Sequence, residues 1–235
     1  MDAEASRSIG DNVRAVYERL HRAALAVGRR VDSVRLVAAT KFVSVEAIRE
    51  GLAAGLTILG ESRLQEALPK IEALRGKPVR WHFIGRLQRR KVRSVVGVFD
   101  LIHSVDTLEL AQEIDRRAKD AGLQQAVLLE VNIGDEATKA GFRPDELLSL
   151  LPELSRLSSM VVRGLMTIPP PASDAEEARP YFRQLRELAQ RLSRNAPSLS
   201  MDELSMGMSN DYVVAVEEGA TFVRIGTAIF GTRRN

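Results

Sequence analysis

The chain contains no cysteine, and this absence excludes several kinds of chemistry. Without cysteine there are no disulfides, no thiolate nucleophile and no thiolate metal ligand. The absence is compatible with a reducing compartment, and we expect a cytoplasmic protein. Long apolar runs are also missing, since none approaches the roughly 18 residues of a membrane span. The stretch 1–10 has no hydrophobic signal core, so the sequence predicts no membrane attachment.

Several common catalytic motifs are absent as well. The sequence shows no Ser-His-Asp order, no Walker motif and no dinucleotide fingerprint. Its three histidines, His21, His82 and His103, are scattered and lack a second ligand at metal spacing, which favours structural roles over a metal site. The basic run 86–93 lies at an expected helix start without interleaved aromatic residues. A solvated basic face is the favoured interpretation, and no nucleic acid is expected as a partner.

The overall composition is that of an ordinary globular protein. The 235 residues are 45% hydrophobic and 28% charged, which allows a sizeable core. The formal net charge of +3 mildly favours an acidic or phosphorylated partner. We find no linker, no low-complexity tract and no sequence repeat other than the alternation of strands and helices described below. We therefore expect a single domain over residues 1–235.

Short apolar runs alternate with amphipathic segments along the chain. The expected strands are 34–39, 57–60, 79–85, 99–105, 126–133, 161–168, 199–204 and 221–226. Helices are expected between them, and a further amphipathic helix covers 6–27, before the first strand. The alternation indicates a parallel barrel or a doubly wound sheet. The N-terminal helix favours the barrel, because it can fill the outer ring between the last strand and the first. We therefore predict a TIM-type (β/α)8 barrel.

Local signals place the helix ends. The expected N-caps are Ser44, Thr107 and Ser209, and the expected capping boxes are Ser62 with Gln65 and Ser173 with Glu176. Gly122 and Gly219 are expected to end helices, Pro144 to open one, and Pro69 to kink or break one.

The first strand ends on a lysine, Lys41. In a parallel barrel this is the face on which active sites are built. A desolvated lysine there can stay partly neutral and attack a carbonyl carbon to form a Schiff base. Successive side chains of a strand point to opposite faces, so if Lys41 points inward, Ala39 and Val37 point inward too. Their small side chains leave room for a ligand. The alternative is a strand-end lysine with its ammonium group in water.

The other end of the chain supplies groups suited to a phosphate. Arg224 is expected to point inward on the last strand, where a buried arginine needs an acceptor. Gly226, Thr227 and Ser209 follow the last two strands, where barrels commonly bind phosphate. Backbone N–H groups, a glycine that permits close approach and two hydroxyls suit a phosphate monoester. Taken singly, Ser209 could be a plain N-cap and Gly226 a tight turn. A lysine for an aldehyde, a phosphate cradle and an arginine together favour pyridoxal phosphate over a sugar phosphate.

The same residues carry a resemblance to a known family. The motifs are LVAATK, GESRLQEALPKI, WHFIGRLQRRK, IHSVD, VNI with GFRP downstream, RGLMTIP, LSMGMSND and EGATFVRIGTAIFG, spread over residues 34–231. On these motifs the sequence resembles the pyridoxal-phosphate homeostasis protein family, stand-alone barrels related to the N-terminal domain of alanine racemase. Three positions depart from the family pattern: Thr40 stands where serine is common, Ser62 where asparagine is usual and Arg86 where histidine is usual. A cofactor contact made by that asparagine would be lost here.

The resemblance implies a specific cofactor site. It implies pyridoxal 5'-phosphate held as an aldimine on Lys41, with the phosphate near Ser209, Gly226 and Thr227. Arg224 would face the ring nitrogen or lie close to the phosphate. It also implies the barrel of fold type III pyridoxal-phosphate enzymes without their C-terminal β domain. No catalytic residue and no metal ligand is assigned.

Two functional classes follow from this site. The first is a non-catalytic carrier that takes part in intracellular pyridoxal-phosphate homeostasis and delivers the cofactor to apo-enzymes that depend on it. The second is an amino-acid racemase or a related enzyme; a Schiff-base aldolase is a weaker third. Racemases of this fold take an opposing tyrosine from a second domain across a dimer, whereas Tyr17, Tyr181 and Tyr212 fall on expected helices here. The carrier is therefore preferred, as a monomer.

Overall fold

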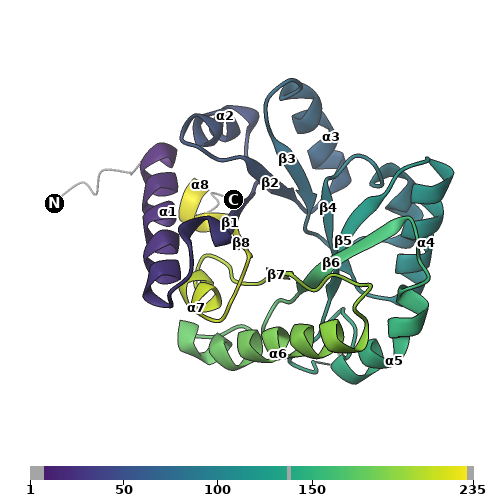
Figure 1. Cartoon of the computed structure of the whole chain (residues 1–235). Helices are drawn as coiled ribbons and strands as arrows, with labels where there is room; N and C mark the ends of the chain where they lie inside the picture. The colour runs from purple at the N-terminus through teal and green to yellow at the C-terminus, as the bar shows by residue number, and fades with distance from the viewer. Residues whose placement is uncertain (1–7, 137–138, 232–235) are drawn as a thin grey trace.

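The computed structural model describes residues 8–136 and 139–231. Within these residues, eight parallel strands form one closed barrel in sequence order (Figure 1). The strands are β1 (Arg35–Ala39), β2 (Ile58–Glu61), β3 (Arg80–Phe83), β4 (Leu101–Val105), β5 (Gln125–Glu130), β6 (Met160–Met166), β7 (Glu203–Ser205) and β8 (Phe222–Ile225). The barrel closes where β8 pairs with β1, with Arg224 opposite Val37. The predicted barrel is confirmed.

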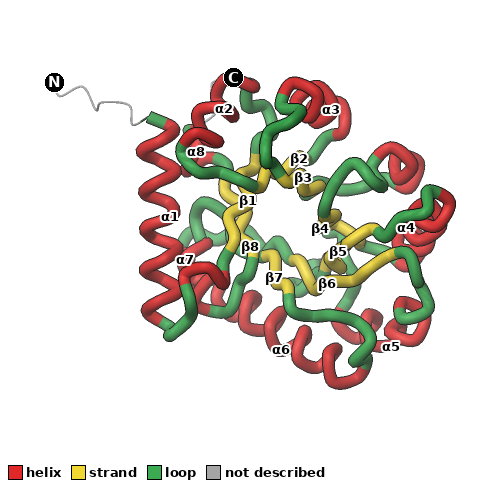
Figure 2. Tube along the Cα trace, turned by 45° about the horizontal axis from the view of Figure 1, so that its top comes forward, coloured by secondary structure: helices red, strands yellow, loops and turns green. Residues whose placement is uncertain are grey.

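Helices form the outer layer around this barrel (Figure 2). The α-helices are α1 (Ile9–Ala26), α2 (Val45–Ala53), α3 (Leu64–Ala73), α4 (Leu108–Asp120), α5 (Pro144–Leu154), α6 (Arg179–Asn195), α7 (Tyr212–Glu217) and α8 (Thr227–Phe230). Three short 3-10 helices join them in the described part of the chain: η1 (Val31–Ser33), η2 (Arg89–Ser94) and η3 (Ala175–Ala178).

Helix α1 completes the ring between β8 and β1, as predicted. It packs against α2, α7 and α8 (Figure 1). The Asn12 side chain donates to the Ile229 carbonyl at 2.9 Å, and Arg29 donates to the carbonyls of Val216 at 2.7 Å and Ala220 at 2.8 Å. The first bond joins α1 to α8, and the other two join the segment after α1 to α7 and to the loop between α7 and β8. Positions 6 and 7 of the expected helix lie outside the described residues.

The core has two layers. A large cluster fills the space between strands and helices, and a smaller one fills the inside of the barrel. The inner cluster consists of Val37, Ile58, Leu101, Leu128, Met166 and Phe222. Val37 lies inside the barrel, as the alternation of strand side chains predicts. The same alternation turns Ala39, Glu130 and Arg224 inward at the carboxyl ends of their strands.

Most predicted helix ends are confirmed. The Ser44 hydroxyl accepts the Ala47 N–H and the Thr107 hydroxyl accepts the Leu110 N–H, both at 3.2 Å. Gly122 adopts a left-handed φ of 66° after α4, and Pro144 opens α5. These signals succeed because each depends only on residues within one helical turn.

Both predicted capping boxes are wrong. Arg63 occupies the N-cap of α3, because the backbone of Ser62 runs on past β2 and packs tightly against Gly85. Glu176 donates its N–H to Asp174 at 3.0 Å and lies in η3, so α6 begins only at Arg179. Pro69 does not break α3, which continues to Ala73. At the two capping boxes, tertiary packing or a neighbouring residue replaces the local pattern.

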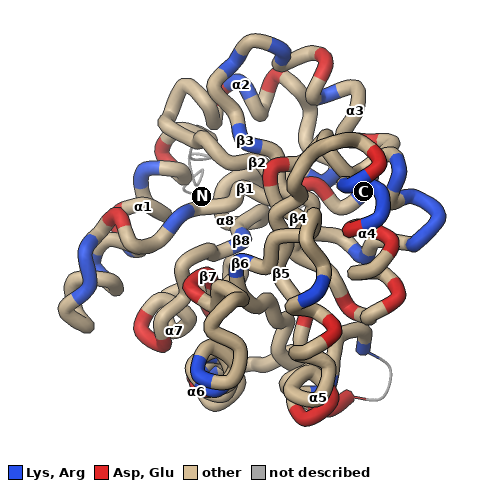
Figure 3. The backbone as a smooth tube through the Cα atoms, turned by 45° about the vertical axis from the view of Figure 1, so that its right-hand side comes forward, with Lys and Arg blue, Asp and Glu red and all other residues tan. Residues whose placement is uncertain are grey.

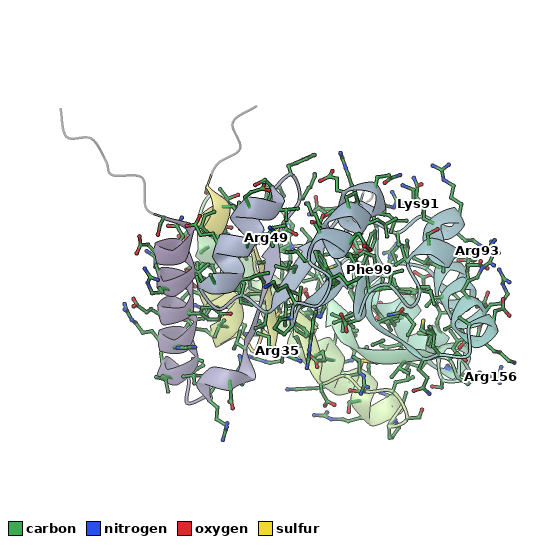
Figure 4. All side chains as sticks on the ribbon, turned by 90° about the horizontal axis from the view of Figure 1, so that it is seen from above. Arg35, Arg49, Lys91, Arg93, Phe99 and Arg156 are labelled. Carbon is green, nitrogen blue, oxygen red and sulfur yellow. The ribbon has the colours of Figure 1, made fainter. Side chains whose placement is uncertain are left out.

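The basic run 86–93 leads into η2 rather than an α-helix. It packs against α4, where blue segments gather in Figure 3. Figure 4 shows Lys91 and Arg93 on the outer side of the barrel wall, and Arg93 is exposed. This run therefore lies on the outer wall of the barrel. No helix in the described ranges has the length and apolarity needed to cross a membrane.

Candidate functional site

Lys41 lies in a tight turn directly after β1. The Val43 N–H donates to the Thr40 carbonyl at 2.9 Å, so Lys41 and Phe42 are the two central residues of a β-turn. Phe42 has a φ of 63°, a conformation that bulky residues rarely adopt. The turn stops the strand and leaves the partly buried Lys41 at the carboxyl end of the barrel. This is the position that the sequence predicts for it.

A cavity of about 980 Å³ opens at this end of the barrel. Its size is that of a small-molecule site. All five residues predicted for the site line it: Lys41, Ser209, Arg224, Gly226 and Thr227. They meet because β8 pairs with β1, so the loop after the last strand lies beside the turn after the first. The structure therefore brings the predicted residues together in one place.

Gly226 joins the two sides of the cavity. It occupies the N-cap of α8, and a Cβ atom at this position would lie 3.2 Å from the Ala39 carbonyl oxygen. A side chain here would push β8 and α8 away from β1. The glycine therefore keeps Thr227 and the first N–H groups of α8 close to the Lys41 turn, where they lack partners within the helix.

Ser209 has a different role from the one predicted. It does not cap α7, which begins at Tyr212 with Asp211 at its N-cap. The Asp211 carboxylate accepts the Met208 N–H at 2.6 Å, and the Ser209 hydroxyl instead accepts the Ala228 N–H at 3.3 Å. The N-cap prediction failed because the capping pattern shows only neighbours in sequence. The observed contact puts a hydroxyl at the start of α8, inside the cavity.

Arg224 is buried at the base of the cavity. It donates to the Ser205 hydroxyl at 2.6 Å and to the Thr167 carbonyl at 2.9 Å. These are the acceptors that a buried arginine requires. Burial lowers the pKa of Arg224 to about 10, which leaves the guanidinium charged at neutral pH. The sequence predicts the inward arginine but not its two partners.

A chain of hydrogen bonds continues from Arg224 into the barrel. Ser205 Oγ lies 2.8 Å from His103 Nδ1, and His103 Nε2 lies 2.9 Å from His82 Nδ1. Ser205 accepts from Arg224, and its own hydroxyl proton finds an acceptor when Ser205 donates to His103 and His103 donates to His82, which is the arrangement we assign. Both histidines then carry their proton on Nε2.

The histidine pair is neutral in the fold. Burial lowers the pKa of His82 to about 3 and lowers that of His103 well below its usual value. The two residues, although scattered in the sequence, are in contact in the fold. Among the described residues, no group of three histidine or acidic side chains is arranged to hold a metal ion.

Glu130 is a further ionisable group at the barrel mouth that the sequence reasoning missed. It ends β5 and faces inward by alternation with Leu128. Burial, and then the nearby Asp106 carboxylate, raise the pKa of Glu130 to about 7 despite the opposing charge of Arg224. An acidic residue at an inward strand end was the signal that could have identified it.

We predict that Glu130 makes the stability of the protein depend on pH. The unfolded chain ionises this carboxyl near its usual 4.5, whereas the folded chain keeps the proton up to about pH 7. The stabilising contribution is therefore full below about pH 4.5 and is lost as the pH rises to 7. The rise in pKa from 4.5 to about 7 corresponds to a loss of about 3 kcal/mol in the free energy of unfolding at high pH. Glu130→Gln, which cannot ionise, should remove this loss.

The measurement is urea-induced unfolding of Glu130→Gln and of the wild type at pH 5 and at pH 8. The variant should gain stability over the wild type at pH 8 and gain little at pH 5. Glu153→Gln, at an exposed glutamate of α5, is the matched control and should behave like the wild type. A gain of equal size at both pH values would contradict the prediction.

Lys139 lines the cavity from the opposite wall. Its Nζ donates to the Pro169 carbonyl at 3.1 Å and lies 2.5 Å from a Glu136 carboxylate oxygen. Among the described residues that line the cavity, Lys41 and Lys139 are the two with a primary amine. The Lys139 amine already has two oxygen partners, which distinguishes it from the Lys41 amine.

Comparison with known proteins gives a consistent result. The family model described as "Alanine racemase, N-terminal domain" matches residues 12–234. The pyridoxal phosphate homeostasis protein of Aquifex aeolicus is 47% identical over 95% of this chain and 98% of its own length. That of Pseudomonas aeruginosa is 43% identical, with 96% of each chain covered.

Solved structures show the same similarity. PipY of Synechococcus elongatus, solved without PLP, has a TM-score of 0.86 and 40% identity, covering 95% of this chain and all of its own. PipY with PLP bound has a TM-score of 0.81 and 43% identity, covering 92% of this chain and all of its own. Alanine racemase of Clostridium difficile, at 17% identity and a TM-score of 0.71, shares the fold over 96% of this chain and 58% of its own.

Proposed function

The chain belongs to the pyridoxal phosphate homeostasis protein family, and on that premise we propose that it binds pyridoxal 5'-phosphate at the carboxyl end of its barrel. The observation that carries the proposal is that Lys41, Ser209 and Thr227 line the same cavity, so that it contains both an amine and two hydroxyls. The family name of the relatives and the PLP-bound structure of PipY support the choice of ligand.

The residues fit the parts of this ligand. Pyridoxal phosphate supplies an aldehyde that an amine can hold covalently, and an electron-withdrawing ring. Lys41 is the proposed amine. The Ser209 hydroxyl and the hydroxyl and N–H of Thr227 are the proposed phosphate donors, and Gly226 lets the backbone come close. Arg224 lies deeper, between Ser205 and Thr167, and is proposed to face the ring nitrogen.

The proposed role is that of a carrier rather than an enzyme. The protein, as one monomeric barrel domain in the cytoplasm, would keep the free aldehyde concentration low and release the cofactor to apo-enzymes. The lining of the cavity supports this role. Among its described residues there is no tyrosine and no histidine that could serve as a second acid or base opposite Lys41. The alternative is an amino-acid racemase that uses the same cofactor.

We predict that the phosphate group provides much of the affinity. A hydrogen bond to a charged group contributes about 1.5 to 3 kcal/mol, so Ser209→Ala or Thr227→Ala should weaken pyridoxal phosphate binding at least about tenfold. Neither change should much affect unphosphorylated pyridoxal, which itself should bind far less well. Binding can be measured by ultrafiltration and by the absorption of the bound ligand.

The matched control for this experiment is Ser173→Ala. Ser173 also lines the cavity, but its hydroxyl bonds to Glu177 at 2.9 Å and it belongs to the loop after β6. It should leave both affinities unchanged. Equal losses for pyridoxal phosphate and pyridoxal in Ser209→Ala and Thr227→Ala would refute the phosphate assignment. A wild-type protein that binds neither ligand would refute the proposed function.

A further inference from the structure

Helix α3 contacts the backbone on both sides of Lys41. The Lys70 ammonium donates to the Thr40 carbonyl at 2.7 Å, and the Glu66 carboxylate accepts the Phe42 N–H at 3.0 Å. Glu66 and Lys70 are four residues apart, so they project from the same face of the helix. The peptide groups before and after Lys41 are thus both bound to one rigid element.

The Lys70 contact belongs to a buried charged network. Lys70 pairs with Glu61 at 2.7 Å, and the Thr40 hydroxyl donates to the same carboxylate oxygen at 2.6 Å. Glu61 is fully buried, and its second oxygen has no hydrogen-bond partner in the structure described. Apolar side chains would fill such a space at least as stably as a buried ion pair. Stability alone therefore does not account for charged residues behind the Lys41 turn.

The backbone of the turn also needs external support. The positive φ of Phe42 is unfavourable for a residue with a large side chain. The Phe42 ring lies 4.8 Å from the Lys41 ammonium nitrogen and 5.1 Å from the Arg63 guanidinium, and Arg63 lies 3.4 Å from Glu66. Glu66 thus contacts the turn directly through the Phe42 N–H and indirectly through Arg63. These contacts fix a conformation that the Lys41 turn would not favour by itself.

We propose that Glu66 and Lys70 are positioning residues, which hold the Lys41 turn so that the Lys41 amine is directed into the cavity. This inference rests on the proposed function, because it concerns the amine that is proposed to take the aldehyde. The α3 clamp, meaning Glu66, Lys70 and the Lys70 partner Glu61, fixes the backbone before the ligand arrives. The amine then loses less freedom on reaction, and adduct formation is faster.

The first test uses the protein without ligand. Amide hydrogen exchange at Phe42, followed by NMR, reports the bond to Glu66 directly. Glu66→Ala should speed this exchange about tenfold, the value of one hydrogen bond of about 1.4 kcal/mol. Glu66→Gln keeps an acceptor oxygen and should restore most of the protection. Glu72→Ala is the matched control, because Glu72 lies on the same helix and pairs with the exposed Arg75 at 2.5 Å.

The second test follows the ligand. The rate at which a borohydride-reducible adduct forms on Lys41 at saturating pyridoxal phosphate should fall about tenfold in Glu66→Ala. The double variant Glu61→Gln/Lys70→Met removes the bond from Lys70 to the Thr40 carbonyl without leaving a buried charge unpaired. It should slow adduct formation similarly. The affinity for pyridoxine 5'-phosphate, which has an alcohol in place of the aldehyde, should stay within about twofold of the wild type.

Each outcome decides the proposal. Wild-type amide exchange and a wild-type rate in Glu66→Ala would overturn it, and so would equal slowing by Glu72→Ala. A parallel loss of pyridoxine phosphate affinity would reveal a general structural defect instead of positioning. If the double variant does not fold, the two Glu66 variants still decide. If the wild type forms no adduct, the proposed function fails, whereas exchange at Phe42 still shows whether the clamp holds the turn.

Discussion

Replacing Lys41 with alanine is expected to abolish the borohydride-reducible adduct between the protein and pyridoxal phosphate. Lys41 carries one of two primary amines among the described residues lining the cavity, and the other, on Lys139, is bound to Glu136 and the Pro169 carbonyl. Only Lys41 lies in the turn beside Gly226 and α8. Non-covalent binding through the phosphate should remain in the variant.

The absorption spectrum before and after borohydride, followed by peptide mapping in a mass spectrometer, measures this effect. In the wild type the reduced adduct should map to Lys41. Lys139→Ala is the matched control, because it removes an amine from the same cavity and should keep the adduct. An adduct found on Lys139 or Lys91 in the wild type would contradict the assignment of Lys41.

The second large effect concerns catalysis. We expect the ligand-bound protein to turn over no amino acid at an enzymatic rate. Arg224 can only donate hydrogen bonds, and a pKa of about 10 keeps it cationic at neutral pH. In its proposed place opposite the ring nitrogen it opposes a proton there, which weakens the ring as an electron sink. The described residues that line the cavity also include no tyrosine or histidine, and a positioned acid or base of that kind contributes about 10² to 10⁴ in rate.

Incubation with L-alanine and other amino acids in heavy water tests this expectation. Deuterium at the α-carbon and loss of chirality report proton removal, and a parallel assay follows the reactivation of a cofactor-depleted enzyme. We expect negligible exchange and clear reactivation. Turnover near about 1 s⁻¹, the low end for ordinary enzymes, would favour the racemase-like alternative over the carrier.

The parts of the fold that depend on short-range patterns could be predicted from the sequence. Alternating apolar runs identified the eight strands, and the alternation of side chains along a strand placed Val37 and Arg224 inside the barrel. The position of α1 followed from the geometry of a closed ring. These predictions needed no knowledge of which side chains from distant strands meet.

The parts of the fold and of the site that depend on contacts between distant segments could not be predicted. His82 and His103 look unrelated in sequence, yet β3 and β4 place them in contact. Ser209 has the pattern of an N-cap, but the Asp211 contact with Met208 turns it toward α8. The raised pKa of Glu130 arises from burial and from Asp106, which directly follows the neighbouring strand β4. The histidine contact, the Ser209 contact with Ala228 and the environment of Glu130 each join residues that are far apart in sequence.

The pairing of β8 with β1 has a consequence for the newly made protein. During synthesis, Lys41 leaves the ribosome long before Gly226 and Thr227 do. The side of the cavity formed by Gly226 and Thr227 does not exist until β8 pairs with β1. A chain that has not yet formed β8 therefore has Lys41 but lacks two of the proposed phosphate-binding residues, Gly226 and Thr227. On the proposed assignment, ligand binding therefore requires the pairing of β1 with β8, and bound ligand would report that the barrel has closed.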